Sequence, residues 1–144
     1  MASVTSTATY LVDTSALARL SVPEVSDVLR PRIDVGRVAI TAVTRLEIGY
    51  SARSRSDHDE SQRRILERLQ LVYGSPRSER RAIEVQQALM NVGQHRAVKL
   101  PDLLIASPAE VEGLIVLHFD ADFDRIATVT DQPVEWVVPA GTAS

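Results

Sequence analysis

Thr9-Tyr10-Leu11-Val12-Asp13-Thr14-Ser15-Ala16-Leu17 is the stretch that decides the fold, because a short apolar run stops at an aspartate and turns directly into helix-forming residues. We interpret it as the first strand of an α/β sheet. Ligands of open α/β sheets bind beyond the carboxyl ends of the strands, so Asp13 would face the ligand side. This stretch alone leaves two roles open for Asp13, a functional carboxylate or the N-cap of the next helix, with Thr14 and Ser15 as alternative caps.

The rest of the chain alternates between strand and helix patterns. Further strands are predicted at 37–41, 71–73, 114–119 and 134–138, and helices at 23–30, 41–53, 64–69, 76–98, 101–113 and 123–127. Ser21 is the expected cap of the helix at 23–30, the polar stretch 54–62 is expected to break the chain, and Gly93 is a weak point or end of its helix. The run 114–119 is apolar throughout, as expected for a central strand covered on both faces.

This alternation predicts one α/β domain with a central, mostly parallel sheet of four to five strands flanked by helices. We expect the domain to span 9–138, with a flexible N-terminal segment at 1–8 and a tail at 139–144. A chain of 144 residues with 44% hydrophobic content suits a single buried core.

Composition excludes several classes of function. The chain has no cysteine, which rules out disulfides, thiolate nucleophiles, zinc-thiolate sites and iron–sulfur clusters, and makes the cytoplasm the expected location. No stretch has the pattern of a signal peptide or the ~20 apolar residues that span a bilayer, so no membrane contact is expected.

The charge balance argues against a protein that coats nucleic acid in general, because the net charge is −3. Lys99 is the only lysine among the 16 basic residues. A local rim for RNA phosphates remains open at Arg19, Arg45, Arg53, Arg55 and Lys99, although surface solubility explains each of them equally well.

Four acidic residues carry the functional signal. Asp13 and Asp120 each end an apolar strand, Asp102 lies in the first turn of a helix, and Glu47 lies on the helix after the second strand. In a parallel sheet all four would converge on one edge. Two unit charges ~4 Å apart repel by about 4 kcal/mol at an effective dielectric of ~20, so protons or a cation must neutralise them. An all-oxygen set favours Mg²⁺ or Mn²⁺ over zinc, and such an ion suits phosphate substrates.

Simpler explanations exist for each position. Asp102 stabilises a helix start by about 0.3–1 kcal/mol without any metal. Glu47 pairs with Arg45 or Arg53 on a solvated face, and His118 is best explained as a strand-end histidine whose hydrogen bonds are satisfied.

Four blocks in order resemble the PIN domain, and more closely the VapC-type toxins of type II toxin–antitoxin pairs. The blocks are 11–17, 44–49, 101–106 and 117–124, and the resemblance covers about 10–138. It implies a Mg²⁺- or Mn²⁺-dependent endoribonuclease with Asp13, Glu47, Asp102 and Asp120 as catalytic and metal-binding residues. Asp13 and Asp102 would hold the metal, Glu47 and Asp120 a second ion or the waters of the first, and the products would carry 5′-phosphates and 3′-hydroxyls.

Neighbouring residues receive weaker assignments from the same resemblance. Thr14 or Ser15 would position a water or a substrate oxygen. Asp122 has no settled role, a water-mediated contact to the metal being one option, and Asp124 is a candidate cap of the following turn. Pro108 departs from the family pattern and costs ~3 kcal/mol in a helix interior. We expect a kink nearby with Asp102 still pointing inward, the alternative being a helix that starts late.

The resemblance also implies partners: a cognate antitoxin protein, an RNA substrate such as tRNA or rRNA, and a second copy in a homodimer. The apolar faces at 25–29 and 46–50 are candidates for the antitoxin contact, or else ordinary core. Two other classes remain alternatives: a receiver-like binding module and a degenerate nuclease kept for protein contacts. A receiver would need an aspartate after its third strand, and Tyr73-Gly74-Ser75 offers none.

Overall fold

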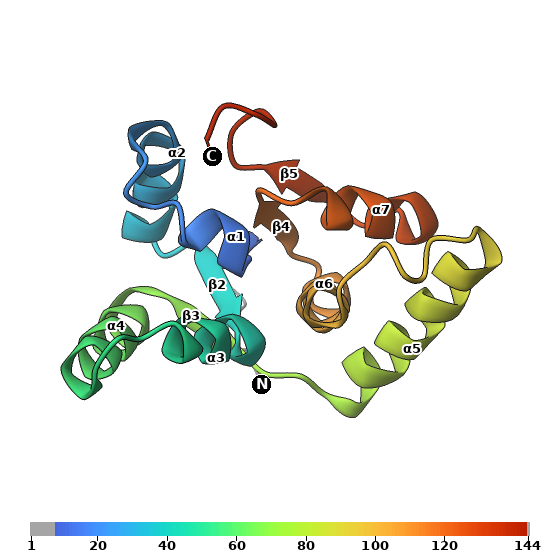
Figure 1. The fold of residues 1–144 in the computed structure, drawn as a ribbon, viewed down its shortest axis with the longest axis horizontal. Coiled ribbons are helices and arrows are strands. Elements are labelled where there is room, and N and C mark those ends of the chain that lie inside the picture. The colour runs from blue at the N-terminus through green and yellow to red at the C-terminus, as the bar shows by residue number, and fades with distance from the viewer. Residues whose placement is uncertain (1–7, 144) are drawn as a thin grey trace.

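The computed structural model of the chain describes residues 8–143 and contains a five-stranded sheet in which every pair of neighbours is parallel, in the order β3-β2-β1-β4-β5 (Figure 1). The strands are β1 (Tyr10–Val12), β2 (Val38–Thr41), β3 (Gln70–Val72), β4 (Ile115–His118) and β5 (Val134–Trp136). The helices are α1 (Thr14–Leu17), α2 (Pro23–Asp34), α3 (Ala42–Tyr50), α4 (Arg55–Arg68), α5 (Pro76–Asn91), α6 (Leu100–Glu112) and α7 (Ala121–Thr130). The predicted α/β class with a parallel sheet is therefore confirmed.

Helices cover both faces of the sheet because successive strand residues point to opposite sides. Leu11 of β1 and Val116 of β4 pack into one buried cluster with α5, α6 and α7, while Val12 and Leu117 pack into a second with α1, α2 and α4. Figure 1 shows α5, α6 and α7 on one side of the strands and the earlier helices on the other. All four of these side chains are fully buried, so β1 and β4 form the centre of the molecule.

Two local predictions are wrong. The stretch 54–62 does not break the chain but belongs to α4, because Ser54 caps the helix and ion pairs between neighbouring turns, such as Arg64 with Glu60, support its polar surface. Ser21 does not cap α2, whose N-cap is Val22 without a side-chain hydrogen bond. The helix at 76–98 ends earlier, at Asn91, just before the left-handed Gly93, as the glycine predicted.

Helix α6 brings its start to the same edge of the sheet as the strand ends, because it runs back before β4 begins. It continues through Pro108 without interruption, and Asp102 stays buried in its first turn. The alternative of a late helix start is therefore wrong, while the kink near Pro108 stays a prediction.

The chain ends fall partly outside this description. Residues 1–7 of the expected N-terminal segment 1–8, and residue 144 of the tail, lie outside the described residues. Within residues 8–143, no helix combines the length and the apolar character needed to cross a membrane.

Candidate active site

Asp13 lies directly after β1 and is 2% exposed. It is the N-cap of α1, accepting hydrogen bonds from the backbone nitrogens of Ser15 at 3.1 Å and Ala16 at 3.2 Å. The Ser15 hydroxyl donates to both carboxylate oxygens, at 2.8 and 2.7 Å. Asp13 therefore has the N-cap role that the sequence left open for it, and neither Thr14 nor Ser15 caps this helix. Burial raises the pKa of Asp13 from 3.8 to about 6, despite these hydrogen bonds.

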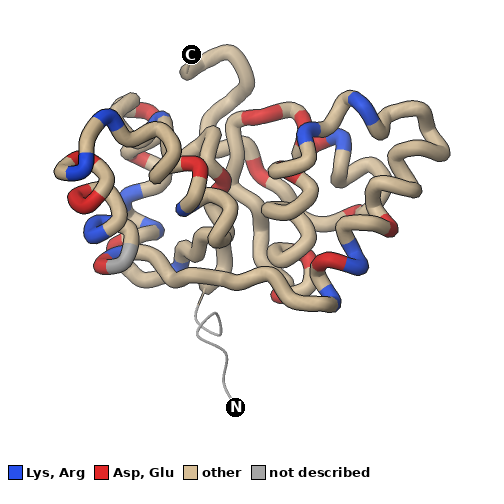
Figure 2. The backbone as a smooth tube through the Cα atoms, turned by 60° about the horizontal axis from the view of Figure 1, so that its bottom comes forward, with Lys and Arg blue, Asp and Glu red and all other residues tan. Residues whose placement is uncertain are grey.

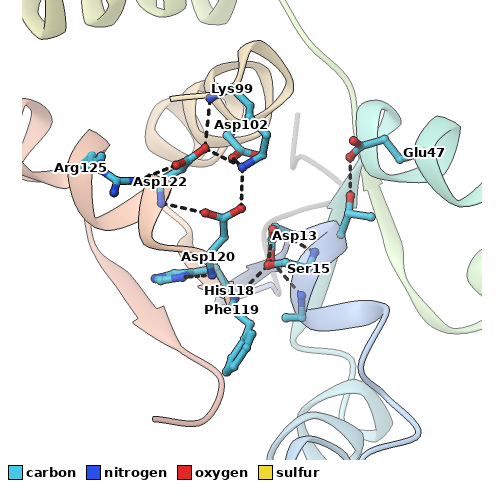
Figure 3. Close-up of polar contacts among 12 residues, drawn as sticks. Asp13, Ser15, Glu47, Lys99, Asp102, His118, Phe119, Asp120, Asp122 and Arg125 are labelled. Carbon is cyan, nitrogen blue, oxygen red and sulfur yellow. Dashed lines mark hydrogen bonds and ion pairs between the residues drawn. The ribbon is translucent and has the colours of Figure 1, made fainter. Parts of the chain in front are cut away.

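Three further carboxylates, from Asp102, Asp120 and Asp122, form an acidic cluster beside Asp13 (Figure 3). One oxygen from each lies within 4.8 Å of one oxygen from each of the others. Asp102 comes from the first turn of α6, Asp120 is the N-cap of α7, and Asp122 lies in the first turn of α7. The fold therefore brings the N-terminal ends of α6 and α7 together at the carboxyl edge of the sheet.

Lys99 lies in the middle of the acidic cluster. Its ammonium donates hydrogen bonds to Asp122 Oδ2 at 2.7 Å and Asp120 Oδ2 at 2.8 Å, and it forms an ion pair with Asp102 Oδ2 at 3.3 Å. Partial burial opposes the ammonium charge, but the hydrogen bonds to Asp120 and Asp122 outweigh it and raise the pKa of Lys99 above its usual range. Arg125 donates to the other Asp122 oxygen at 2.8 Å.

Asp102 Oδ2 is buried and has no hydrogen-bond donor, since its ion pair with Lys99 lacks hydrogen-bond geometry. The residue is 6% exposed. Burial and the nearby Asp122 carboxyl raise the pKa of Asp102 well above its usual range. An all-carboxylate set with one unsatisfied buried oxygen fits the ligand preference of a hard divalent cation such as Mg²⁺ or Mn²⁺.

Of the four predicted carboxylates, Asp102 and Asp120 lie together and Asp13 lies next to them. The Asp120 charge adds to the raised pKa of Asp13, behind burial. Glu47 is not part of the acidic cluster: it accepts a 2.6 Å hydrogen bond from the hydroxyl of Thr14. In Figure 3, Asp13 lies between Glu47 and the acidic cluster.

Sequence reasoning assigns Asp122 no settled role and leaves Lys99 open between an RNA-phosphate rim and ordinary surface solubility. Its prediction that Asp124 caps a turn is wrong, because Asp120 caps α7 and Asp124 instead accepts a hydrogen bond from Trp136 Nε1 at 2.8 Å. A signal for Asp122 was present: it lies two residues after a strand-end aspartate, within the first turn of the helix that follows.

His118 forms a hydrogen bond with the backbone of Asp120. Its Nδ1 accepts a hydrogen bond from the Asp120 backbone nitrogen at 3.2 Å, and its ring lies 4.9 Å from Trp136 and 5.3 Å from Phe123, measured between ring centroids. Burial lowers the pKa of His118, which keeps the ring neutral. Its Nε2 has no hydrogen-bond partner and lies 3.6 Å from the Asp124 carboxylate. The prediction that both ring nitrogens of His118 are hydrogen-bonded therefore holds only for Nδ1.

A groove of about 630 Å³ opens between the pair α1 and α2 and the pair α3 and α4, with Thr14 at its rim. Its apolar lining consists mainly of Leu17, Leu20, Ile33, Ile48, Ile65 and Leu69. Two apolar faces were candidates for partner contact or ordinary core. At 25–29 the second option holds, because Val25 and Leu29 are fully buried core. At 46–50, Leu46 and Tyr50 are 72% and 93% exposed.

Charged residues are distributed unevenly around this site. In Figure 2 basic and acidic residues alternate toward the two ends of the elongated molecule, whereas the upper middle, on the side of the sheet opposite the N-terminus, carries several acidic residues. Arg19, from the predicted rim, lies over the Phe119 ring at 4.5 Å and donates to the Ser15 carbonyl oxygen at 2.7 Å.

Comparison with known proteins identifies relatives over almost the whole chain. Residues 10–129 match the PIN domain family model. The chain is 48% identical over 135 residues to ribonuclease VapC51 of Mycobacterium tuberculosis, covering 92% of this chain and 96% of the relative. It is 47% identical over 137 residues to ribonuclease VapC21 of the same species, covering 95% and 99%.

Solved structures share the fold. The crystal structure of VapBC2 from Rickettsia felis bound to a promoter DNA fragment aligns with a TM-score of 0.74 and 19% identity, over 88% of this chain and 98% of the matched chain. VapBC-1 from nontypeable Haemophilus influenzae gives 0.73 and 18%, over 89% and 97%.

Proposed function

The chain belongs to the PIN domain family, and from this premise we propose that it is the toxin of a type II toxin–antitoxin pair, a metal-dependent endoribonuclease. The curated relatives of nearly equal length are named ribonucleases, and the family is one of hydrolases that act on RNA. An enzyme of this kind works in the cytoplasm, where its RNA substrates are.

One observation carries the proposal: Asp13 and the acidic cluster meet at the carboxyl edge of the sheet, and Asp102 Oδ2 is buried there without a hydrogen-bond donor. Burying carboxylates this close together is unfavourable unless cations balance them, and Lys99 and Arg125 supply only two positive charges for the four carboxyl groups. The alternative of a receiver-like module lacks such support. That module needs an aspartate after its third strand, and β3 is not followed by an acidic residue.

Asp13, Asp102 and Asp120, with Asp122, would hold Mg²⁺ or Mn²⁺. When bound, such an ion supplies charge neutralisation at the scissile phosphate and a water of lowered pKa for in-line attack. The chain's own residues prepare that place. The Ser15 hydroxyl fixes the orientation of the Asp13 carboxylate, and the imidazole of His118 fixes the backbone of Asp120.

Glu47 would act at one remove from the metal. It accepts a 2.6 Å hydrogen bond from the Thr14 hydroxyl, and the oxygen of that hydroxyl lies 3.1 Å from Thr44 Oγ1. This chain of contacts orients the backbone of α1 next to Asp13. A carboxylate in this position can also hold water that approaches the phosphate.

A cognate antitoxin would occupy the groove between the pair α1 and α2 and the pair α3 and α4. The groove combines an apolar floor with charged walls that include Arg64 and Glu60, and it reaches Thr14, the residue after Asp13. A segment seated there would cover the approach to the carboxylates. Solved structural neighbours are themselves toxin–antitoxin complexes.

The toxin would also form a homodimer, which light scattering of the isolated protein would test.

The substrate would be a structured RNA such as tRNA or rRNA, recognised through shape and single-stranded loops. The test is induced expression of the toxin followed by mapping of new RNA 5′ ends across the transcriptome. New 5′ ends should cluster at a few sites in cells that make the wild type and should be missing in cells that make Asp102→Asn. Asp27→Asn, at an exposed position of α2, is the control and should give the same ends as the wild type. Identical maps for the wild type and Asp102→Asn would overturn the proposal.

A further inference from the structure

The only lysine of the chain has its ammonium inside the acidic cluster. Lys99 Nζ lies 2.7 Å from an oxygen of Asp122, 2.8 Å from one of Asp120 and 3.3 Å from one of Asp102. Every other basic side chain apart from the histidines is arginine. The one position where the chain has lysine instead of arginine therefore lies at the candidate metal site.

The geometry accounts for the choice of lysine. An ammonium is a compact charge with three donor hydrogens, so it can address three oxygens from three different carboxylates that converge on one point. The planar fork of arginine instead suits two oxygens of one carboxylate or phosphate. Here the three acceptors come from the first turn of α6, the N-cap of α7 and the first turn of α7, and no two of them belong to the same residue.

The same oxygens are those that the proposed function gives to a divalent ion. The oxygens that contact Lys99 are the Oδ2 atoms of Asp102, Asp120 and Asp122, and Asp102 Oδ2 is the buried one without a hydrogen-bond donor. Mg²⁺ binds oxygens at about 2.1 Å. An ammonium and a divalent ion that share the same three oxygens repel each other strongly, because their charges lie only a few ångströms apart in a partly buried site.

We propose that Lys99 is a built-in counter-cation that holds the acidic cluster together before metal binds and that swings out to solvent when a divalent ion enters. This inference rests on the proposed function. The swing is sterically open, since the side chain is 60% exposed. The backbone nitrogen of Lys99, at the start of α6, donates a 3.0 Å hydrogen bond to Asp122 Oδ2, which also contacts the ammonium. A carboxylate oxygen can accept from the backbone and bind a cation at once, so only the side chain of Lys99 has to move.

Selective labelling makes the displacement directly visible. Protein grown with ¹³C- and ¹⁵N-labelled lysine gives side-chain NMR signals from Lys99 alone, because no other lysine exists in the chain. On titration of the wild type with Mg²⁺, the Lys99 Cε and Hε signals should move in a saturable way toward the values of a free, solvated lysine. Saturable Mg²⁺ binding by calorimetry with unmoved Lys99 signals would overturn the inference and leave the proposed function standing.

A pair of variants tests competition without relying on a spectrum. Lys99→Met should bind Mg²⁺ about tenfold more tightly than the wild type, because the competing charge is gone. Arg125→Met removes a cation that contacts only Asp122 Oδ1, so it should change the affinity less than about threefold. Equal gains in both variants, or weaker binding by Lys99→Met, would contradict displacement. Absence of Mg²⁺ binding in every variant and the wild type would overturn the proposed function as well.

Discussion

The backbone nitrogen of Phe119 donates a 2.9 Å hydrogen bond to the hydroxyl of Ser15, joining two segments that are 104 residues apart. The same hydroxyl donates to the carboxylate of Asp13. The end of β4 thus fixes a side chain that in turn fixes the carboxylate at the end of β1. Orientation of the candidate site therefore depends on the pairing of these two strands.

Ser15→Ala should lower the free energy of unfolding by about 1–3 kcal/mol, because the Phe119 nitrogen and the Asp13 carboxylate both lose a partner. Urea denaturation measures this. Ser51→Ala is the matched control: its hydroxyl bonds an exposed carbonyl oxygen, and its removal should cost less than about 0.5 kcal/mol. Equal losses of unfolding free energy in the two variants would show that the Ser15 hydrogen bonds stabilise the fold no more than the exposed hydrogen bond of Ser51.

Asp13 should make the metal-free protein less stable as the pH rises. Its folded-state pKa is about 6, raised above 3.8 mainly by burial, so its stabilising contribution is fully present below pH 3.8 and is lost as the pH rises through about 6. The full loss amounts to about 3 kcal/mol at most. Asp13→Asn cannot ionise, so its stability relative to the wild type should improve between about pH 4 and about pH 8.

Chemical denaturation in EDTA at the two pH values measures this difference. A constant offset between Asp13→Asn and the wild type would mean that the carboxyl at position 13 ionises alike in the folded and unfolded chain.

Glu47→Gln should keep the fold, since its amide oxygen can still accept the Thr14 hydrogen bond, yet slow RNA cleavage by about 10- to 100-fold. The lost property is the negative charge beside Asp13. Initial rates at saturating Mg²⁺ measure the effect, with Glu67→Gln on exposed α4 as the control that should cleave normally. Wild-type rates from Glu47→Gln would remove this residue from the active site.

Ala18→Arg should separate toxicity from neutralisation. Ala18 is an exposed residue that lines the groove proposed for the antitoxin, so a long charged side chain there would obstruct a bound segment without entering the core. Co-expressed antitoxin should no longer restore growth, although cleavage by the isolated toxin persists. Gln86→Arg, on the exposed face of α5, should remain neutralised. Full rescue of Ala18→Arg would place the antitoxin elsewhere.

The order of strands and helices was predictable because periodicity and turn residues are local signals. Asp13 and Asp120 could be assigned to the sheet edge for the same reason, since each directly follows an apolar run. The part of α4 before residue 64 was missed because its stability comes from ion pairs, such as Arg63 with Glu60 and Glu67, rather than from an apolar stripe.

The contents of the acidic cluster were harder to predict. The direction of Asp122 depends on where α7 begins, which the Asp120 cap determines. A long, flexible side chain such as Lys99 carries no local signal of where its ammonium lies. The helix of Glu47 is correctly predicted, but its carboxylate accepts a hydrogen bond from Thr14 rather than joining the acidic cluster, because the phase of the helix decides where the side chain lies. The role of Glu47 in the active site stays a prediction.

The most direct test of the account is cleavage of RNA by the purified chain with Mg²⁺ as the variable. We predict that the wild type cuts RNA only when Mg²⁺ or Mn²⁺ is added, leaves 5′-phosphates, and stops in EDTA, and that Asp102→Asn is slower by about 100-fold or more. Undiminished cleavage in EDTA, or equal rates from Asp102→Asn and the wild type, would contradict the claim that these carboxylates form a metal-dependent nuclease site.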